Sequence, residues 1–140
     1  VVMHMRGTPE TMQNLAEYDD PTADLLVYFK NRLDLLARAG VDPDRVVLDP
    51  GIGFAKKRRH NLEILRRLQE IVDLGRPVLL GTSRKRIVGE LTGREPKDRL
   101  YGTLGSLVVG YMKGVRIFRI HDVAPARDAL AVAAAVEFGE

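Results

Sequence analysis

Four short apolar runs recur along this chain, and each leads through polar or glycine residues into a segment with helical periodicity. The runs cover residues 1–5, 45–48, 77–80 and 115–120. Short apolar runs bounded by turn residues are typical of strands, whereas apolar residues spaced three and four apart are typical of helices. Strands that alternate with helices form parallel sheets with right-handed crossovers. The sequence therefore predicts an α/β fold of about four strand–helix units, either an open doubly wound sheet or one half of an eight-stranded barrel.

The expected helices have recognisable end signals. Asp20 is a suitable N-cap before Pro21, and Gly40 ends the first helix. The apolar face of this helix consists of Leu25, Phe29, Leu33 and Leu36. In the second helix, which ends before Gly75, the apolar positions are Leu62, Leu65, Leu68 and Val72. Further helices are expected over residues 85–91, 98–112 and 125–136.

The composition is that of one globular domain, with 140 residues of which 45% are hydrophobic and 29% charged. The chain has no Cys, and no apolar stretch approaches the ~18 residues that cross a bilayer, so we expect a cytoplasmic location and no membrane partner.

Much of the net charge of +3 comes from Lys56–Arg59. Because no aromatic residue interleaves with this run, we expect a solvated surface loop and no nucleic-acid partner.

Polar side chains follow three of the apolar runs. Arg119 and His121 end the last run, and their spacing of two places both side chains on one face of a strand. Parallel α/β folds carry their sites at the carboxyl ends of the strands. We therefore expect one shared pocket. Its predicted members are Asp49, Ser83, Arg84, Lys85, Arg119 and His121.

Four ordered motifs give this pattern a specific resemblance. They are residues 3–13 (MHMRGTPETMQ), 49–56 (DPGIGFAK) with His60 and Asn61, 81–85 (GTSRK) and 119–122 (RIHD). In this order and spacing they resemble dihydropteroate synthase, over nearly the whole chain. That family has a (β/α)8 barrel and joins a dihydropterin diphosphate to 4-aminobenzoate, releasing pyrophosphate. The resemblance implies that residues 1–140 are the carboxyl-terminal half of a pterin-binding barrel, with the amino-terminal half absent from the chain.

The resemblance also implies roles for individual residues. Lys85, Arg119 and His121 are the expected catalytic residues, with the Arg–His pair stabilising the diphosphate leaving group. The expected substrate-binding residues are Met3, Asp49, Phe54, Gly81, Ser83 and Arg84, together with the three catalytic ones. Asp49 would accept N–H groups of the pterin, Met3 would lie against its ring, and Phe54 would face the aminobenzoate.

Alternative interpretations remain for several of these residues. Asp49 is also suited to capping the turn before Pro50, Phe54 to ordinary core packing, and Met3 to the core of the sheet. Of the other histidines, His4 is expected to be structural and His60 to lie at a helix start.

Three further expectations follow from the resemblance. Arg86 stands where the family often has a small hydroxyl residue near the aminobenzoate carboxylate, and a guanidinium could bind that carboxylate too. Mg²⁺ is the implied cofactor, with its protein ligand in the amino-terminal half. The family dimerises through helices of its carboxyl-terminal half, so we expect a homodimer.

Two other classes of function are compatible with the pattern. One is a related pterin-binding methyltransferase domain, which shares the Asp-Pro-Gly motif but would need a cobalamin partner. The other is a non-catalytic half-barrel that binds anions. For a dihydropteroate synthase we expect little or no activity from this chain alone, because half of the pterin contacts and the Mg²⁺ contact are missing.

Overall fold

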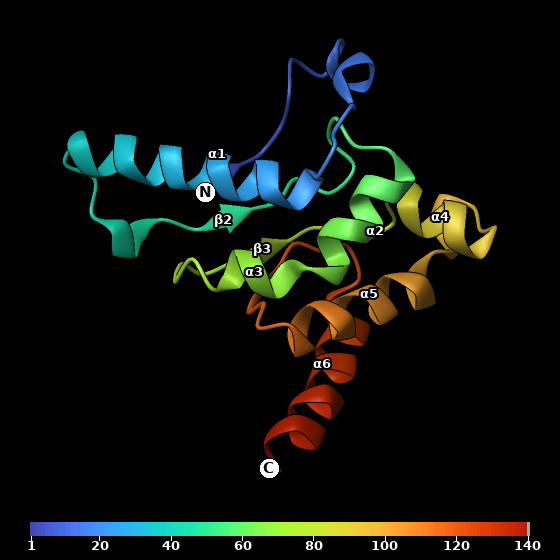
Figure 1. The fold of residues 1–140 in the computed structure, drawn as a ribbon. Coiled ribbons are helices and arrows are strands. Elements are labelled where there is room, and N and C mark those ends of the chain that lie inside the picture. The colour runs from blue at the N-terminus through green and yellow to red at the C-terminus, as the bar shows by residue number, and fades with distance from the viewer. Residues whose placement is uncertain (140) are drawn as a thin grey trace.

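The computed structural model describes residues 1–139, which form four short parallel strands alternating with helices (Figure 1). The strands are β1 (Val2–Met3), β2 (Leu48–Asp49), β3 (Leu79–Leu80) and β4 (Ile117–Phe118). Three of them lie within the apolar runs and β2 begins at the last residue of its run, so the α/β class with parallel strands is confirmed. The strands are shorter than the predicted runs because only two residues of each form a continuous ladder.

The strands follow one another in chain order across the molecule. β1 pairs with β2 and β3 pairs with β4, both in parallel, and one bridge from Leu48 to Val78 joins the two pairs. Single hydrogen bonds extend the contacts, such as that from the Arg119 N–H to the Leu80 carbonyl at 3.0 Å. Parallel pairing brings the carboxyl ends of all four strands to the same edge.

The helices connect and cover the strands. The α-helices are α1 (Pro21–Arg38), α2 (Arg58–Arg66), α3 (Leu68–Val72), α4 (Arg86–Thr92), α5 (Leu100–Met112) and α6 (Val123–Phe138). Short 3₁₀ turns are η1 (Met12–Leu15), η2 (Pro43–Arg45) and η3 (Pro96–Asp98). None of the helices between residues 1 and 139 is both long and apolar enough to cross a membrane.

The predicted signals of the first helix are confirmed. The Asp20 carboxylate accepts hydrogen bonds from the backbone N–H groups of Thr22 and Ala23, at 3.0 and 2.9 Å, and thereby satisfies two of the free donors at the start of α1. At the other end, Gly40 adopts a φ of 79°, a backbone conformation that residues other than glycine rarely adopt.

The prediction for the second helix is wrong in two respects. The segment is interrupted at Arg67, whose φ of −103° and ψ of 23° separate α2 from α3. The fully buried positions are Ile64, Leu68 and Ile71, which the spacing of four and three residues places on one face. Leu62, Leu65 and Val72, the other expected apolar positions, are partly buried and pack against the apolar core.

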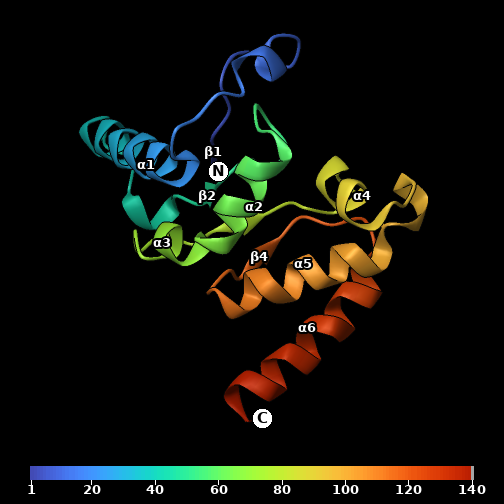
Figure 2. The same cartoon turned by 45° about the vertical axis from the view of Figure 1, so that its right-hand side comes forward.

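A single apolar core lies between the strands and the covering helices. Its buried members are Leu25, Phe29, Val46, Leu48, Ile52, Ile64, Leu68, Ile71, Val78, Leu80, Ile87, Val88 and Val115. Around it, α1 contacts α2 and α3, while α5 contacts α4 and α6 (Figures 1 and 2). Helix α6 extends from the rest of the molecule toward the carboxyl terminus (Figure 2). This arrangement leaves the loops that follow the strands free to carry polar groups.

Candidate functional site

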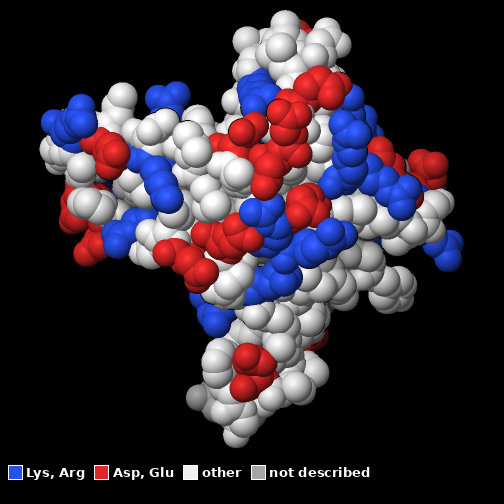
Figure 3. Space-filling model, viewed as in Figure 1, with Lys and Arg blue, Asp and Glu red and all other residues white. Residues whose placement is uncertain are grey.

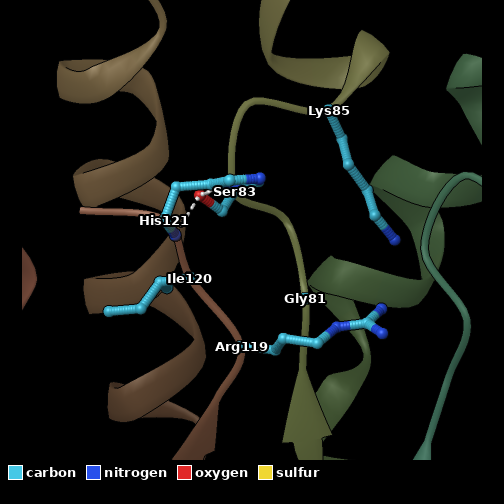
Figure 4. Close-up of a pocket in the computed structure, with 6 residues that line it drawn as sticks. All are labelled: Gly81, Ser83, Lys85, Arg119, Ile120 and His121. Atoms are coloured by element: carbon cyan, nitrogen blue, oxygen red, sulfur yellow. Dashed lines mark hydrogen bonds between the residues drawn. The ribbon is translucent and has the colours of Figure 1, made fainter. Parts of the chain in front are cut away.

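A pocket of about 360 Å³ opens at the carboxyl ends of β3 and β4. Its lining residues, drawn in Figure 4, are Gly81, Ser83, Lys85, Arg119, Ile120 and His121. Five of these six were predicted to bind substrate, and Ile120 was not. The structure thus brings the cationic and hydroxyl groups of two separate loops to one cavity.

Arg119 reaches the pocket across the backbone of Gly81 (Figure 4). A Cβ atom built on Gly81 would lie 3.2 Å from Nη2 and 3.3 Å from Nε of the guanidinium, closer than most Cβ contacts. The absence of a side chain at this position therefore leaves room for the arginine. A planar guanidinium held in this way presents parallel N–H donors that suit phosphate or carboxylate oxygens.

Ser83 and His121 form a direct link between the two loops. The Ser83 Oγ lies 2.9 Å from Nδ1 of His121 and also accepts the backbone N–H of His121 at 3.2 Å. Either atom can be the donor in the contact between Oγ and Nδ1. When the Ser83 hydroxyl donates to Nδ1, a neutral imidazole carries its proton on Nε2, where it can donate to an anion in the pocket.

Lys85 connects this pocket to the loop that follows β2. Its ammonium donates to the Ile52 carbonyl and lies 4.6 Å from the centre of the Phe54 ring, within the range of a cation–π contact. Burial lowers the pKa of Lys85 to about 8; Asp49 opposes this shift and Arg119 adds to it. The charge of Lys85 is therefore only partly neutralised by the protein and is available to a bound anion.

Asp49 lies at the end of β2, is buried, and uses one oxygen locally. Its Oδ1 accepts the backbone N–H of Gly51 at 2.8 Å, so the turn-capping interpretation of this residue is realised in the structure. Met3 lies on the other side of this turn: a Cβ on Gly51 would be 3.4 Å from its Cγ. Asp49, Met3 and Phe54 thus occupy the β1 and β2 end of the same edge, outside the lining of the Gly81 pocket.

Arg84 is turned away from the pocket, contrary to the expectation of a substrate contact there. Its guanidinium makes two hydrogen bonds to the Asp122 carboxylate, of 3.0 Å from Nε and 2.5 Å from Nη2. Its backbone has a positive φ of 55°, and its N–H donates to Thr103 Oγ1 at 3.1 Å. Arg84 therefore holds the β3 loop to the β4 loop. Similarly, Arg86 is exposed and pairs with Glu90 at 3.0 Å.

The prediction of a solvated basic loop over Lys56–Arg59 is wrong in two respects, since Lys56 is buried and Arg58 and Arg59 begin helix α2. Lys56 is fully buried, with its ammonium among backbone carbonyls, because the chain turns inward before α2 begins. Lys57 and Arg59 are exposed, as expected, and both pair with Glu17. This pairing reduces the positive potential that a nucleic acid would require.

Several residues of the sequence motifs support the site through contacts that the sequence did not predict. Asn61, at the start of α2, accepts the Gly53 N–H at 2.8 Å and so holds the loop after β2. Of the histidines, His60 lies in the first turn of α2 as expected, and His4 is buried against the rings of Tyr18 and Tyr28. A contact between residues so far apart in the chain depends on tertiary packing, which spacing does not encode.

The charge of the pocket suits an anion. Among residues 1–139, no group of three or more His, Cys, Asp or Glu side chains is arranged to hold a metal ion. Lys85 and Arg119 would also repel a divalent cation that lacked its own anionic ligand. The donors present are the ones that bind phosphate, diphosphate or carboxylate groups.

Comparison with known proteins agrees with this geometry. Residues 1–121 match the pterin binding enzyme family. A dihydropteroate synthase of Synechocystis sp. is 42% identical over 124 residues, which are 88% of this chain and 43% of the relative.

The fold of this chain is also found in solved structures of dihydropteroate synthases. A Yersinia pestis dihydropteroate synthase, solved with a sulfonamide drug complex, is 35% identical and superimposes with a TM-score of 0.95 over 99% of this chain and 50% of its own. The Thermus thermophilus enzyme in complex with 4-aminobenzoate is 47% identical, with a TM-score of 0.92 over 96% of this chain and 52% of its own.

The chain therefore belongs to the pterin binding enzyme family. It spans about half the length of the relatives that it matches.

Replacement of Arg119 by Ala should weaken the binding of pyrophosphate to this chain about tenfold or more, because a charge-assisted hydrogen bond inside the pocket is lost. Isothermal calorimetry measures the affinity. The matched control is Lys57→Ala, which removes an exposed cation that pairs with Glu17. Equal losses in the two variants would indicate diffuse electrostatic attraction instead of a pocket.

Pyrophosphate binding should also weaken as the pH rises from 7 to 9, because Lys85, with a pKa of about 8, loses its charge in this interval. The variant Lys85→Met should bind more weakly at pH 7 and should lack this decrease. Since pyrophosphate itself titrates, the comparison is between the two pH profiles measured by calorimetry in the same buffers. Identical profiles would contradict a role for the Lys85 charge.

Proposed function

We propose that this chain is the carboxyl-terminal part of a dihydropteroate synthase, which condenses a dihydropterin diphosphate with 4-aminobenzoate and releases pyrophosphate. The single observation that supports this most strongly is the convergence of Ser83, Lys85, Arg119 and His121 on one pocket at the strand ends. In this proposal the chain forms the second half of a (β/α)8 barrel, about four strand–helix units. The order β1 to β4 and the half-length match to the relatives support it.

The reaction is a substitution at the methylene carbon of the dihydropterin. The C–O bond to the diphosphate breaks and its electron pair leaves with the pyrophosphate, while the amine nitrogen of 4-aminobenzoate forms the new C–N bond and then loses a proton. Negative charge therefore builds up on the leaving group. Arg119, Lys85 and the Nε2–H of His121 stabilise that charge, since preorganised donors are worth most where charge develops.

The β1 and β2 end of the site receives the pterin ring in this proposal. Asp49 keeps one oxygen free for pterin N–H groups while its other oxygen holds the turn at Gly51. Lys85, which lies beside both Asp49 and Phe54, links the pterin end to the anion end. Met3 supplies an apolar wall at the same end.

Magnesium stays a prediction based on the resemblance. Since the pocket of this chain is cationic, none of its residues is assigned to the metal. A bound Mg²⁺ would neutralise further charge on the diphosphate oxygens.

The alternative of a pterin-binding methyltransferase domain is less well supported, because the matched relatives and structures described above are dihydropteroate synthases. An absence of nucleic-acid partners and a cytoplasmic location remain predictions. A measurement of pyrophosphate release from the two substrates distinguishes the synthase from a non-catalytic anion-binding half-barrel, because only the synthase releases it.

Alone, the chain should release little or no pyrophosphate from the two substrates. Supplied with the amino-terminal segment of a full-length relative, by co-expression, it should regain turnover because the remaining contacts are then assembled. In that complex, Lys85→Met should lower kcat/KM about a hundredfold, on the scale of one lost transition-state donor, and Lys57→Ala should not. A reconstituted complex without turnover would favour the anion-binding alternative.

The helices α5 and α6 support the proposal of a homodimer. Figure 3 shows that the lower part of the visible face, where these helices lie, has few charged side chains. Exposed apolar residues on the two helices are Tyr101, Val109, Met112, Val123, Val132, Val136 and Phe138. An apolar surface of this kind is typical of an interface between proteins.

Light scattering at micromolar concentration should therefore give the mass of a dimer or larger assembly for the unmodified chain. Val132→Asp, on α6, should shift the mass toward the monomer because it introduces a charge into the apolar contact. Val27→Asp, a similarly exposed position on α1, is the control and should leave the mass unchanged. A monomeric unmodified chain would contradict the proposal.

A further inference from the structure

Lys56 is fully buried, and its ammonium group lies among four acceptors. Three are close: the Phe54 carbonyl at 2.9 Å, Nδ1 of His4 at 3.0 Å and the Gly51 carbonyl at 3.1 Å. The fourth is the His4 carbonyl at 3.4 Å. An ammonium has three N–H donors, so the three close acceptors satisfy it completely.

These acceptors come from two different segments of the chain. His4 directly follows β1, whereas Gly51 and Phe54 belong to the loop after β2. The loop is pressed against β1: a Cβ on Gly51, whose φ is 63°, would lie only 2.0 Å from the His4 carbonyl oxygen. Three carbonyl oxygens converge on this buried point. Their dipoles repel one another unless a cation lies between them.

Burial opposes the positive charge of Lys56, so the converging acceptors have to stabilise its ammonium form. Burial lowers the pKa of Lys56 to about 7, with Asp49 opposing the shift and Lys85 and Arg6 adding to it. Burial, together with the charge of Lys56, lowers the pKa of His4 to about 3. The imidazole of His4 is thus neutral near pH 6.5, where Nδ1 can accept the ammonium proton.

We propose that Lys56 is a positioning residue whose ammonium acts as a tethered monovalent cation and fixes the loop after β2 against the end of β1. This loop follows Asp49 directly and carries Phe54, so its shape determines how these two side chains meet a ligand. The identity of that ligand as a pterin rests on the proposed function. The role of Lys56 in fixing the loop does not depend on which ligand binds.

The test uses Lys56→Ala at pH 6.5, with or without ammonium chloride. The variant leaves a space with converging carbonyls into which a free ammonium ion fits and tetramethylammonium does not. The first readout is the ¹⁵N NMR signal of His4 Nδ1. It should shift when the hydrogen bond from Lys56 is lost and should return toward its original position in ammonium chloride, but not in tetramethylammonium chloride of equal ionic strength.

The second readout is binding of 6-hydroxymethylpterin and of pyrophosphate, each measured by calorimetry. Pterin affinity should fall about tenfold in Lys56→Ala and recover in ammonium chloride. Pyrophosphate affinity should change less than about twofold, since Ser83, Lys85 and Arg119 are untouched. The exposed neighbour provides the control, because Lys57→Ala should change neither the affinities nor the His4 signal.

Several outcomes would overturn the proposal. The first is an unchanged His4 signal in Lys56→Ala, and the second is a change in that signal that ammonium does not reverse. The third is an equal loss of pterin and pyrophosphate binding, which would indicate general destabilisation. If the variant does not fold, recovery of folding in ammonium chloride alone supports the proposal, and equal behaviour in both salts contradicts it. If the unmodified chain binds no pterin, the proposed function fails, while the His4 readout still decides the role of Lys56.

Discussion

Parallel pairing of the strands is the constraint on which the candidate site depends. Because β1 to β4 run in the same direction, their carboxyl ends share one edge, and the loops that leave them are forced together. The apolar core below this edge holds the strands in register. Residues from positions 3 to 121 thereby contribute to one surface, although they are distant in the sequence.

The same edge concentrates positive charge in one fully buried and one partly buried lysine. Burial lowers the pKa of Lys85 to about 8 and that of Lys56 to about 7, and in both cases Asp49 opposes the shift. The two lysines have different environments. Lys56 is satisfied by the protein itself, whereas Lys85 lines a pocket with Arg119, where charge remains for a ligand. Lys56 thus maintains the loop after β2, whereas Lys85 can bind an anionic ligand.

Glycine residues and short polar links adjust this edge at defined points. Gly81 leaves room for the Arg119 guanidinium, and Gly51 allows the loop after β2 to touch β1. The contacts of Ser83 with His121 and of Arg84 with Asp122 join the loops after β3 and β4. Positioning of the donors therefore depends on loop-to-loop contacts as much as on the strands.

The sequence by itself determined the α/β class, the limits of the first helix and the meeting of Ser83, Lys85, Arg119 and His121 at one pocket. These features follow from local rules: apolar periodicity, caps such as Asp20, and the position of polar groups after strands. The sequence did not determine that Asp49 and Arg84 lie outside the lining of that pocket. Only the tertiary structure decided that Lys56 is buried, that Arg84 pairs with Asp122, and that Ile64 and Ile71 face the core. Each of these depends on contacts between distant segments, and burial changes the preferred partner of a charged side chain without leaving a local signal in the sequence.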